Sequence, residues 1–216
     1  MLRCFFLVCI ASVYLVASTG ETLAAIFPGL EQDKSTVSRA NSTEPTKITG
    51  EVLMVVMPAS NCARLVCTMG SLGTFAGLWL GARAFGAPFS VTGVAVNPTT
   101  GYTREKAAAL VNEMSAAYGL DIAAAPEDMD IIYADAAHDY AGPGYNVPDA
   151  KTRGAVELLA RTEGIFLDPC YTAKSFRGFC DIARELDGGA IFVHTGGTPA
   201  LWTQEHLDAF AADYWN

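Results

Sequence analysis

Two glycine-rich turns, each directly after an apolar run of strand length, constrain the fold of this chain more than any other feature. An apolar run at 65–67 leads through the turn 70–74 into a helical pattern, and a run at 190–194 leads through the turn 195–198 into another. Apolar strands that alternate with helices indicate a parallel sheet with helices on both faces. Ligands of such sheets bind beyond the carboxyl ends of the strands, so we expect both turns at the same edge.

The same alternation continues between the two turns. It predicts strands at 90–96 and 131–134, and helices at 74–85, 103–118, 149–161 and 175–186. Thr103 and Asp149 stand at the starts of two of these helices, where a side-chain oxygen accepts hydrogen bonds from the first free amides. The predicted fold class is therefore α/β, with a parallel sheet flanked by helices.

Composition divides the chain into three parts. Residues 1–20 place an apolar run after Arg3 and end in small residues, which is the order typical of a secretory signal. Residues 21–50 are mainly polar and indicate a linker, and residues 51–216 are expected to form one domain. The alternative to a secretory signal is an added leader in front of an intracellular protein, so the sequence leaves the compartment open.

Charge and cysteine spacing exclude several kinds of partner. The net charge of −9 argues against nucleic acid or an anionic membrane. The cysteines beyond residue 20 are Cys62, Cys67, Cys170 and Cys180. They show no CxxC spacing and no paired histidines, so no metal site is expected.

The turn 70–74 is the best candidate for a ligand site. Its residues are Gly70, Ser71, Leu72, Gly73 and Thr74. The glycines let several backbone amides point into one concavity at a helix amino end, which suits a phosphate, and the two hydroxyls add donors. The pattern is neither a P-loop nor GxGxxG, which disfavours nucleotide hydrolysis and a dinucleotide. On this motif alone, a tight turn without a ligand is the alternative.

Four longer motifs follow one another in the chain. They are residues 70–78 (GSLGTFAGL), 142–148 (GPGYNVP), 158–174 (LLARTEGIFLDPCYTAK) and 194–201 (HTGGTPAL). Together they resemble the D-cysteine desulfhydrase and 1-aminocyclopropane-1-carboxylate (ACC) deaminase family of pyridoxal 5′-phosphate (PLP) enzymes. The resemblance implies a partial domain of fold type II, similar to the tryptophan synthase β subunit, with PLP as its cofactor and a small amino acid as its substrate.

The resemblance also implies roles for single residues. The backbone and hydroxyl groups of residues 70–74 would hold the phosphate of PLP, and Thr195 would place its hydroxyl at the pyridine nitrogen. Tyr145 and Tyr171 would line the substrate side as catalytic residues, where a phenol could protonate a departing thiolate. Without the resemblance, each tyrosine is better interpreted as a half-buried core aromatic.

Thr172 separates two activities within the family. The resemblance places Thr172 at the cofactor, where the deaminase branch has a glutamate that keeps the pyridine nitrogen protonated. A hydroxyl supports a weaker electron sink, which suffices for β-elimination but suits the opening of a cyclopropane ring less well. The chain is therefore predicted to follow the desulfhydrase branch, which converts D-cysteine to pyruvate, ammonia and sulfide. An activity like that of ACC deaminase is the alternative.

One part of the family pattern has no match. The family carries its Schiff-base lysine upstream of the phosphate loop, whereas the lysines here are Lys34, Lys47, Lys106, Lys151 and Lys174. Lys174 matches a different family lysine, for which we expect a structural role. We therefore expect a chain truncated relative to the family and inactive alone. The second hypothesis is a non-catalytic PLP- or phosphate-binding domain that forms a homodimer or pairs with another chain.

The remaining candidates for chemistry are expected to be structural. We predict His138 and His206 on the surface of a loop or helix and His194 in a structural role at a strand end. Ser71 is not in a GxSxG turn, so a serine hydrolase is disfavoured. Three residues depart from the family: Phe75 replaces a polar residue near the phosphate loop, Cys170 replaces an apolar one, and Ala173 replaces a glycine.

Overall fold

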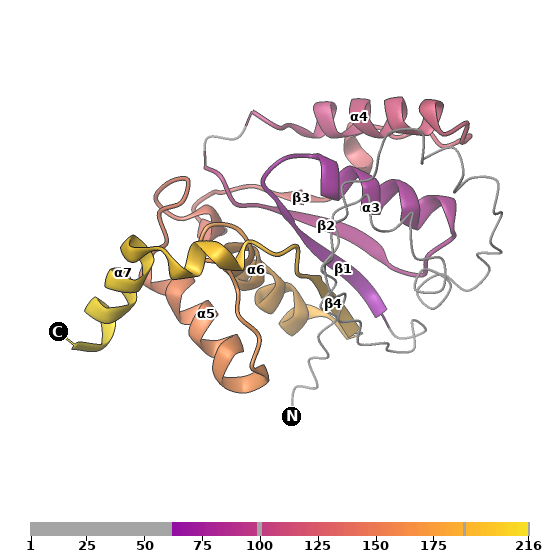
Figure 1. Cartoon of the computed structure of the whole chain (residues 1–216). Helices are drawn as coiled ribbons and strands as arrows, with labels where there is room; N and C mark the ends of the chain where they lie inside the picture. Colours follow the sequence, from indigo (N-terminus) through magenta and orange to yellow (C-terminus); the bar gives the residue numbers. More distant parts are fainter. Residues whose placement is uncertain (1–61, 99–100, 188, 216) are drawn as a thin grey trace, which may run out of the picture.

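The structure, a computed structural model, describes residues 62–98, 101–187 and 189–215. Its centre is a parallel sheet with the strand order β3-β2-β1-β4 (Figure 1). The strands are β1 (Cys62–Met69), β2 (Ser90–Ala95), β3 (Ile131–Ile132) and β4 (Gly189–Val193). The predicted α/β class with a parallel sheet is confirmed. The signal-like segment at 1–20 and the linker at 21–50 lie outside the described residues and stay predictions.

Helices occupy most of the chain between and after the strands. They are α3 (Gly73–Ala84), α4 (Arg104–Ala117), α5 (Ala150–Glu163), α6 (Thr172–Glu185) and α7 (Gln204–Trp215). Three short 3₁₀ helices join them: η2 (Pro126–Asp128), η3 (Asp139–Ala141) and η4 (Thr198–Trp202). Within the described ranges, none of the helices has the length and hydropathy needed to cross a bilayer.

The sheet has helices on both faces, as predicted. In Figure 1, α3 and α4 lie on one side of the sheet and α5 and α6 on the other. The side chains of β1 alternate between two cores: Leu65 and Cys67 pack in the core of α3 and α4, and Val66 packs in the core of α5 and α6. β1 is therefore covered on both faces, which fits the apolar run at 65–67.

The two glycine-rich turns leave the sheet at the same edge. β1 pairs in parallel with β4, and Cys67 lies opposite Val193 near the carboxyl ends of both strands. The turn after β1 and the turn after β4 therefore begin beside each other. The predicted shared edge is confirmed.

Two helix starts follow the predicted chemistry and one does not. The Thr103 side chain accepts a hydrogen bond from the amide of Lys106 at the start of α4, and Asp149 accepts one from Thr152 at the start of α5. The prediction that α6 begins at 175 was wrong, because the helix starts at Thr172. The helix predicted after the turn 195–198 corresponds to η4, which begins at Thr198, whereas no range was predicted for α7.

Candidate functional site

The amino end of α3 is open. Its N-cap residue, Leu72, makes no side-chain capping hydrogen bond, and its carbonyl accepts the first helical bond from the amide of Ala76 at 2.8 Å. The amides of the first turn have no acceptor within the helix. Ser71 and Gly73 are exposed and Thr74 is partly exposed, so donors of the turn 70–74 face solvent. These are the features that an anion site at a helix end requires.

The neighbouring helix α6 is closed by its own chain. The buried carboxylate of Asp168 accepts hydrogen bonds from the amides of Cys170 at 2.9 Å, Tyr171 at 2.7 Å and Thr172 at 2.7 Å. Gly197 has a φ of +86°, and a Cβ added there would lie 2.8 Å from Cγ of Asp168. The turn after β4 therefore packs directly on this carboxylate, and only glycine fits at that point. Asp168 was not among the predicted residues, although an aspartate before a proline is a turn signal.

Thr172 completes this closed end. Its side chain is fully buried, its hydroxyl donates to Oδ1 of Asp168 at 2.6 Å, and the amide of Asp168 donates back to that hydroxyl at 2.9 Å. The structure thus uses the hydroxyl to hold the turn. The predicted role of Thr172 at a cofactor requires the hydroxyl to exchange these partners, and it stays a prediction.

Tyr171 joins the open turn to the closed one. A Cβ added at Gly70 would lie 3.0 Å from Cε1 of Tyr171, so the ring rests directly on the backbone of the first turn residue. The hydroxyl of Tyr171 also meets that of Tyr145 in a short hydrogen bond, and the two rings pack edge to face with centroids 5.8 Å apart. Three of the predicted site residues therefore lie together at the carboxyl edge of the sheet.

The environment of the tyrosine pair favours a protonated Tyr171. The hydrogen bond with Tyr145 and partial burial raise the pKa of Tyr171 above its usual range. At neutral pH this phenol is a proton donor and not a base. Cys170 lies beside the pair with a buried side chain, and burial raises the pKa of its thiol, so it replaces an apolar residue without adding a thiolate.

Thr195 follows β4 at the same edge and is partly exposed. The residue before it, His194, is buried between two backbone groups. The amide of Gly196 donates to Nδ1 of His194 at 3.0 Å, which leaves the proton on Nε2, and Nε2 donates to the carbonyl of Phe166 at 2.9 Å. The structural role predicted for His194 is confirmed by these contacts.

The described lysines are each bonded away from the open turn. Lys106 donates to the carbonyl of Gly101 at 2.7 Å, and Lys151 pairs with Asp139 at 3.0 Å. Lys174 is fully buried, and its ammonium group donates to two backbone carbonyls at 2.7 Å each. Burial lowers the pKa of Lys174. The contacts fit the predicted structural role, while Lys34 and Lys47 lie outside the described residues.

Two other side chains occupy positions that differ from the expected ones. His206 is 1% exposed, so the prediction of a surface position was wrong, whereas His138 lies at the surface and pairs with Asp135 at 3.0 Å. Phe75 is fully buried under β2, where a Cβ at Gly93 would lie 2.9 Å from its ring. Phe75 is therefore a core residue, and its ring does not occupy the amides or hydroxyls of the open turn.

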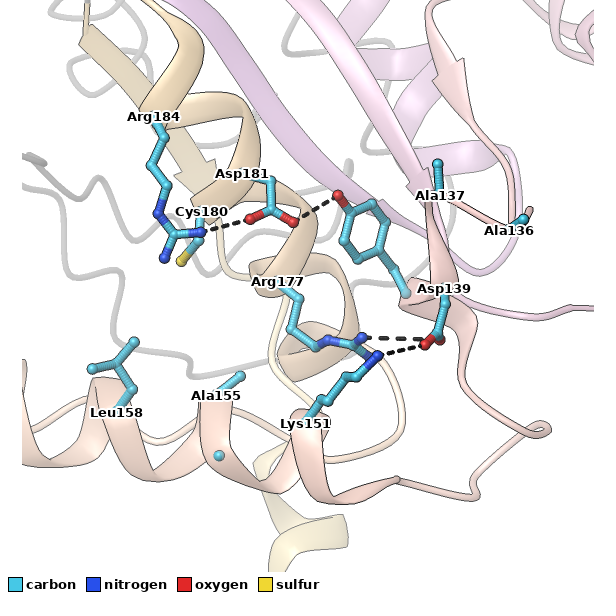
Figure 2. A pocket seen from close by; sticks show the side chains of 12 residues that line it. Ala136, Ala137, Asp139, Lys151, Ala155, Leu158, Arg177, Cys180, Asp181 and Arg184 are labelled. Atoms are coloured by element: carbon cyan, nitrogen blue, oxygen red, sulfur yellow. Dashed lines mark hydrogen bonds and ion pairs between the residues drawn. The ribbon is translucent and has the colours of Figure 1, made fainter.

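A separate open pocket of about 460 Å³ lies among η3, α5 and α6 (Figure 2). None of the predicted site residues lines it. The charges in the pocket satisfy one another: Asp181 accepts from Arg184 at 2.6 Å and from the hydroxyl of Tyr140 at 2.9 Å (Figure 2). Charged groups of this pocket therefore bond to one another, and the predicted site residues lie elsewhere, at the sheet edge. The part of the chain that the structure describes holds no cluster of three metal-ligating side chains.

The residues at the sheet edge fit a phosphorylated aromatic cofactor. The open end of α3 supplies unpaired amides and hydroxyls for a dianion, Tyr145 and Tyr171 supply phenols, and Thr195 supplies a further hydroxyl at the same edge. At the closed end of α6, the carboxylate of Asp168 is buried and bonded to amides, so its negative charge does not face the anion site. The donor set is thus suited to a negatively charged group on one side and a substrate on the other.

Comparisons with known proteins agree with this interpretation. Residues 11–196 match the family described as "Pyridoxal-phosphate dependent enzyme". A protein of Thermotoga maritima named "Putative 1-aminocyclopropane-1-carboxylate deaminase" is 36% identical over 143 residues, which are 65% of this chain and 43% of that protein. A crystal structure of an "ACC deaminase homologue" superposes with a TM-score of 0.61 and 24% identity, covering 83% of this chain and 48% of the other. The chain spans less than half the length of both.

Proposed function

Because this chain belongs to the family of pyridoxal-phosphate dependent enzymes, whose cofactor is PLP, we propose that it supplies the phosphate-binding and tyrosine-bearing side of a PLP site. The observation that carries the proposal is the uncapped amino end of α3 with the ring of Tyr171 resting on its first residue. Residues 70–74 hold the phosphate in this proposal, and Thr195 lies toward the ring of the cofactor. The substrate is a small amino acid.

PLP, when bound, withdraws electrons from the α-carbon of an amino acid and so allows its bonds to break. The chain's own residues then have three tasks. The amides of the α3 end fix the phosphate and so orient the ring. The phenol of Tyr171, protonated at neutral pH, donates a proton to a group leaving the β-carbon. Tyr145, through its hydrogen bond to Tyr171, orients that proton.

We propose that such a site serves the β-elimination of D-cysteine, which with water gives pyruvate, ammonia and sulfide. The described lysines all bond elsewhere, so in this proposal the base that takes the α-proton is a lysine outside the described residues or on a partner chain. The resemblance places the hydroxyl of Thr172 where the deaminase branch has a carboxylate, and this supports the choice because a weaker electron sink suffices for elimination. For that role the hydroxyl must exchange its bonds to Asp168. An activity like that of ACC deaminase is the second candidate, and the name of the Thermotoga maritima relative favours it. The two reactions differ in product, since only the first releases sulfide.

A non-catalytic PLP- or phosphate-binding domain is the alternative from a different class. It is supported by the described lysines, each of which bonds elsewhere. In this alternative the chain binds PLP through its phosphate alone and forms a homodimer or pairs with another chain. Reduction with borohydride followed by peptide mapping separates the two classes, because only a Schiff base leaves a lysine labelled.

The experiment that tests the proposal is a titration of the full chain with PLP, followed by absorbance and calorimetry, and with pyridoxal, which lacks the phosphate. We expect PLP to bind at least tenfold more tightly than pyridoxal, a difference of about 1.4 kcal/mol. Inorganic phosphate should compete. The variant Ser71→Ala should weaken PLP, while Ser90→Ala, which also removes an exposed serine hydroxyl, should not. Equal affinity for PLP and pyridoxal would contradict the proposal.

Sulfide and ammonia assays then identify the reaction. D-cysteine, L-cysteine and ACC are offered in turn to the chain with saturating PLP. Sulfide from D-cysteine supports the first reaction, and ammonia from ACC supports the second. PLP binding with neither product supports the non-catalytic domain.

A further inference from the structure

The loop that carries Tyr145 is held from two sides. We call residues 142–148 the tyrosine loop. Lys174 of α6 holds its beginning, because the buried ammonium group donates to the carbonyls of Ala141 and Gly144 at 2.7 Å each. The other contact comes from α7, which follows the tyrosine loop by more than fifty residues in the sequence.

Asn146, next to Tyr145, has an unfavourable backbone conformation. Its φ is 53°, and it is the one non-glycine residue with a positive φ in the part of the chain that the structure describes. Asparagine tolerates this left-handed region better than most residues, but the conformation persists only where neighbours hold it. A residue in this conformation directly after Tyr145 sets the direction in which Tyr145 points.

The side chain of Asn146 is held by His206. Nε2 of His206 lies 3.2 Å from Oδ1 of Asn146 and donates to it. The ring is 1% exposed, and Nδ1 is buried without a hydrogen-bond partner. An apolar side chain would fill this position without leaving a buried nitrogen unpaired. Within the described residues, the hydrogen bond to Asn146 is the one polar interaction that the ring of His206 makes.

Helix α7 does not depend on His206 for its attachment. Arg153 of α5 donates to Asp213 of α7 at 2.9 Å, and Phe210 packs against the core of α5 and α6. We therefore expect the helix to stay docked when the hydrogen bond between His206 and Asn146 is removed. Its position beside Tyr145 points to a role in the site.

We propose that His206 is a positioning residue for Tyr145: through Asn146 it fixes the tyrosine loop so that the hydroxyl of Tyr145 meets that of Tyr171. The catalytic meaning of this contact rests on the proposed function, but the positioning itself does not. Helix α7 thus helps to position a residue of a site whose proposed phosphate-binding part, residues 70–74, lies near the other end of the described sequence.

Oxidative cross-linking of tyrosines tests this inference without PLP or substrate. Oxidation couples neighbouring tyrosine rings through carbons beside their hydroxyls, and the rings of Tyr145 and Tyr171 have centroids 5.8 Å apart with their hydroxyls in contact. The peptide that joins residues 145 and 171 is quantified by mass spectrometry. Tyr145→Phe and Tyr171→Phe identify that peptide by abolishing it. We expect the wild-type chain to form it, His206→Ala to lose it several-fold, and His206→Gln to retain it, because the glutamine amide can donate to Asn146.

A second variant tests the inference in case His206→Ala does not fold. Asn146→Gly keeps the positive φ and removes the hydrogen bond without touching α7, so it should also lose the cross-link. The inference is overturned if folded His206→Ala or Asn146→Gly cross-links as well as the wild type, or if the wild type gives no such peptide. PLP affinity should stay within twofold in His206→Ala, because the α3 donors are untouched. A failure of the wild-type chain to bind PLP would contradict the proposed function and leave the cross-linking result standing.

Discussion

The amino ends of α3 and α6 lie side by side at one edge of the sheet, joined where Tyr171 rests on Gly70, and they are finished in opposite ways. The end of α6 is sealed by the buried carboxylate of Asp168, which accepts hydrogen bonds from three backbone amides. The end of α3 has no side-chain cap. Helix ends are normally satisfied by side chains, water or ligands. The comparison shows that a side chain satisfies the free amides of only one of these two adjacent helix ends.

Opening the sealed end should have the largest effect. Asp168→Ala removes the acceptor of three amides and of the Thr172 hydroxyl, and leaves these groups buried. We expect a loss of about 3 kcal/mol or more in the free energy of unfolding. Urea unfolding measures the loss. As a control, Asp149→Ala removes a helix cap that also lies 3.5 Å from Arg177, and it should cost only about 1 to 2 kcal/mol. Similar losses in both variants would mean that the α6 end is not special.

Removing the ammonium group of Lys174, in the first turn of α6, should have the next largest effect. Lys174→Met leaves the carbonyls of Ala141 and Gly144 without a donor, which should cost about 2 kcal/mol at pH 7. Lys151→Met, at an exposed pair, should cost under about 0.5 kcal/mol and serves as the control.

The cost of Lys174→Met should also depend on pH. Burial lowers the pKa of Lys174 in the folded chain, so above that pKa the unfolded chain binds more protons than the folded one. The stability of the wild type relative to Lys174→Met should therefore rise as pH increases toward the ordinary lysine value of about 10.4. Urea unfolding of both proteins across this range checks the sign. A difference that stays flat or shrinks would contradict it.

Sealing the open end should cost binding and leave folding intact. Ser71→Asp puts a carboxylate beside the free amides of α3, where it acts as an internal anion. We expect PLP and inorganic phosphate to bind at least tenfold more weakly, about 1.4 kcal/mol, with stability unchanged or slightly raised. Thr103→Asp, at the amino end of α4, should change neither affinity. Full affinity in Ser71→Asp would show that the open end is not the phosphate site.

Separating the two ends should have the smallest effect. In Gly70→Ala the new Cβ would lie 3.0 Å from Cε1 of Tyr171, so the ring must shift, at a cost of about 1 kcal/mol. Gly73→Ala meets no atom within 4 Å and should be neutral or stabilising. Thermal unfolding of the two variants, with the cross-link between residues 145 and 171 as a second readout, measures the difference. Equal melting temperatures and equal cross-linking in the two variants would show that the ring of Tyr171 does not pack on Gly70.

Local chemistry made most of the fold predictable. The caps at Thr103 and Asp149 act on amides three residues away, and both were predicted from the sequence. The start of α6 was placed at Ser175 because the true cap, Asp168, lies beyond Pro169 and four residues before Thr172. The hydroxyl of Ser175 instead meets that of Thr68 at 2.5 Å and ties the helix to β1.

The candidate site was predictable only in part. The turn 70–74 could be proposed from glycines and strand order, but the meeting of Tyr145 with Tyr171 came from resemblance, since no spacing rule links residues so far apart. The burial of His206 was missed for the same reason, because its hydrogen-bond partner is Asn146, in another segment. The engagement of the Thr172 hydroxyl by Asp168 was missed because the predicted helix began too late.

The pairing of β1 with β4 has a consequence for how the chain acquires this site during synthesis. These neighbouring strands come from nearly opposite ends of the described sequence, so the nascent chain closes its largest loop only after β4 has emerged from the ribosome. Until then one side of β1 has no strand beside it, and its unpaired N–H and C=O groups are open to chaperones or to a second nascent copy. Slowing translation just before β4 should therefore lower the yield of soluble protein more than slowing it after β4.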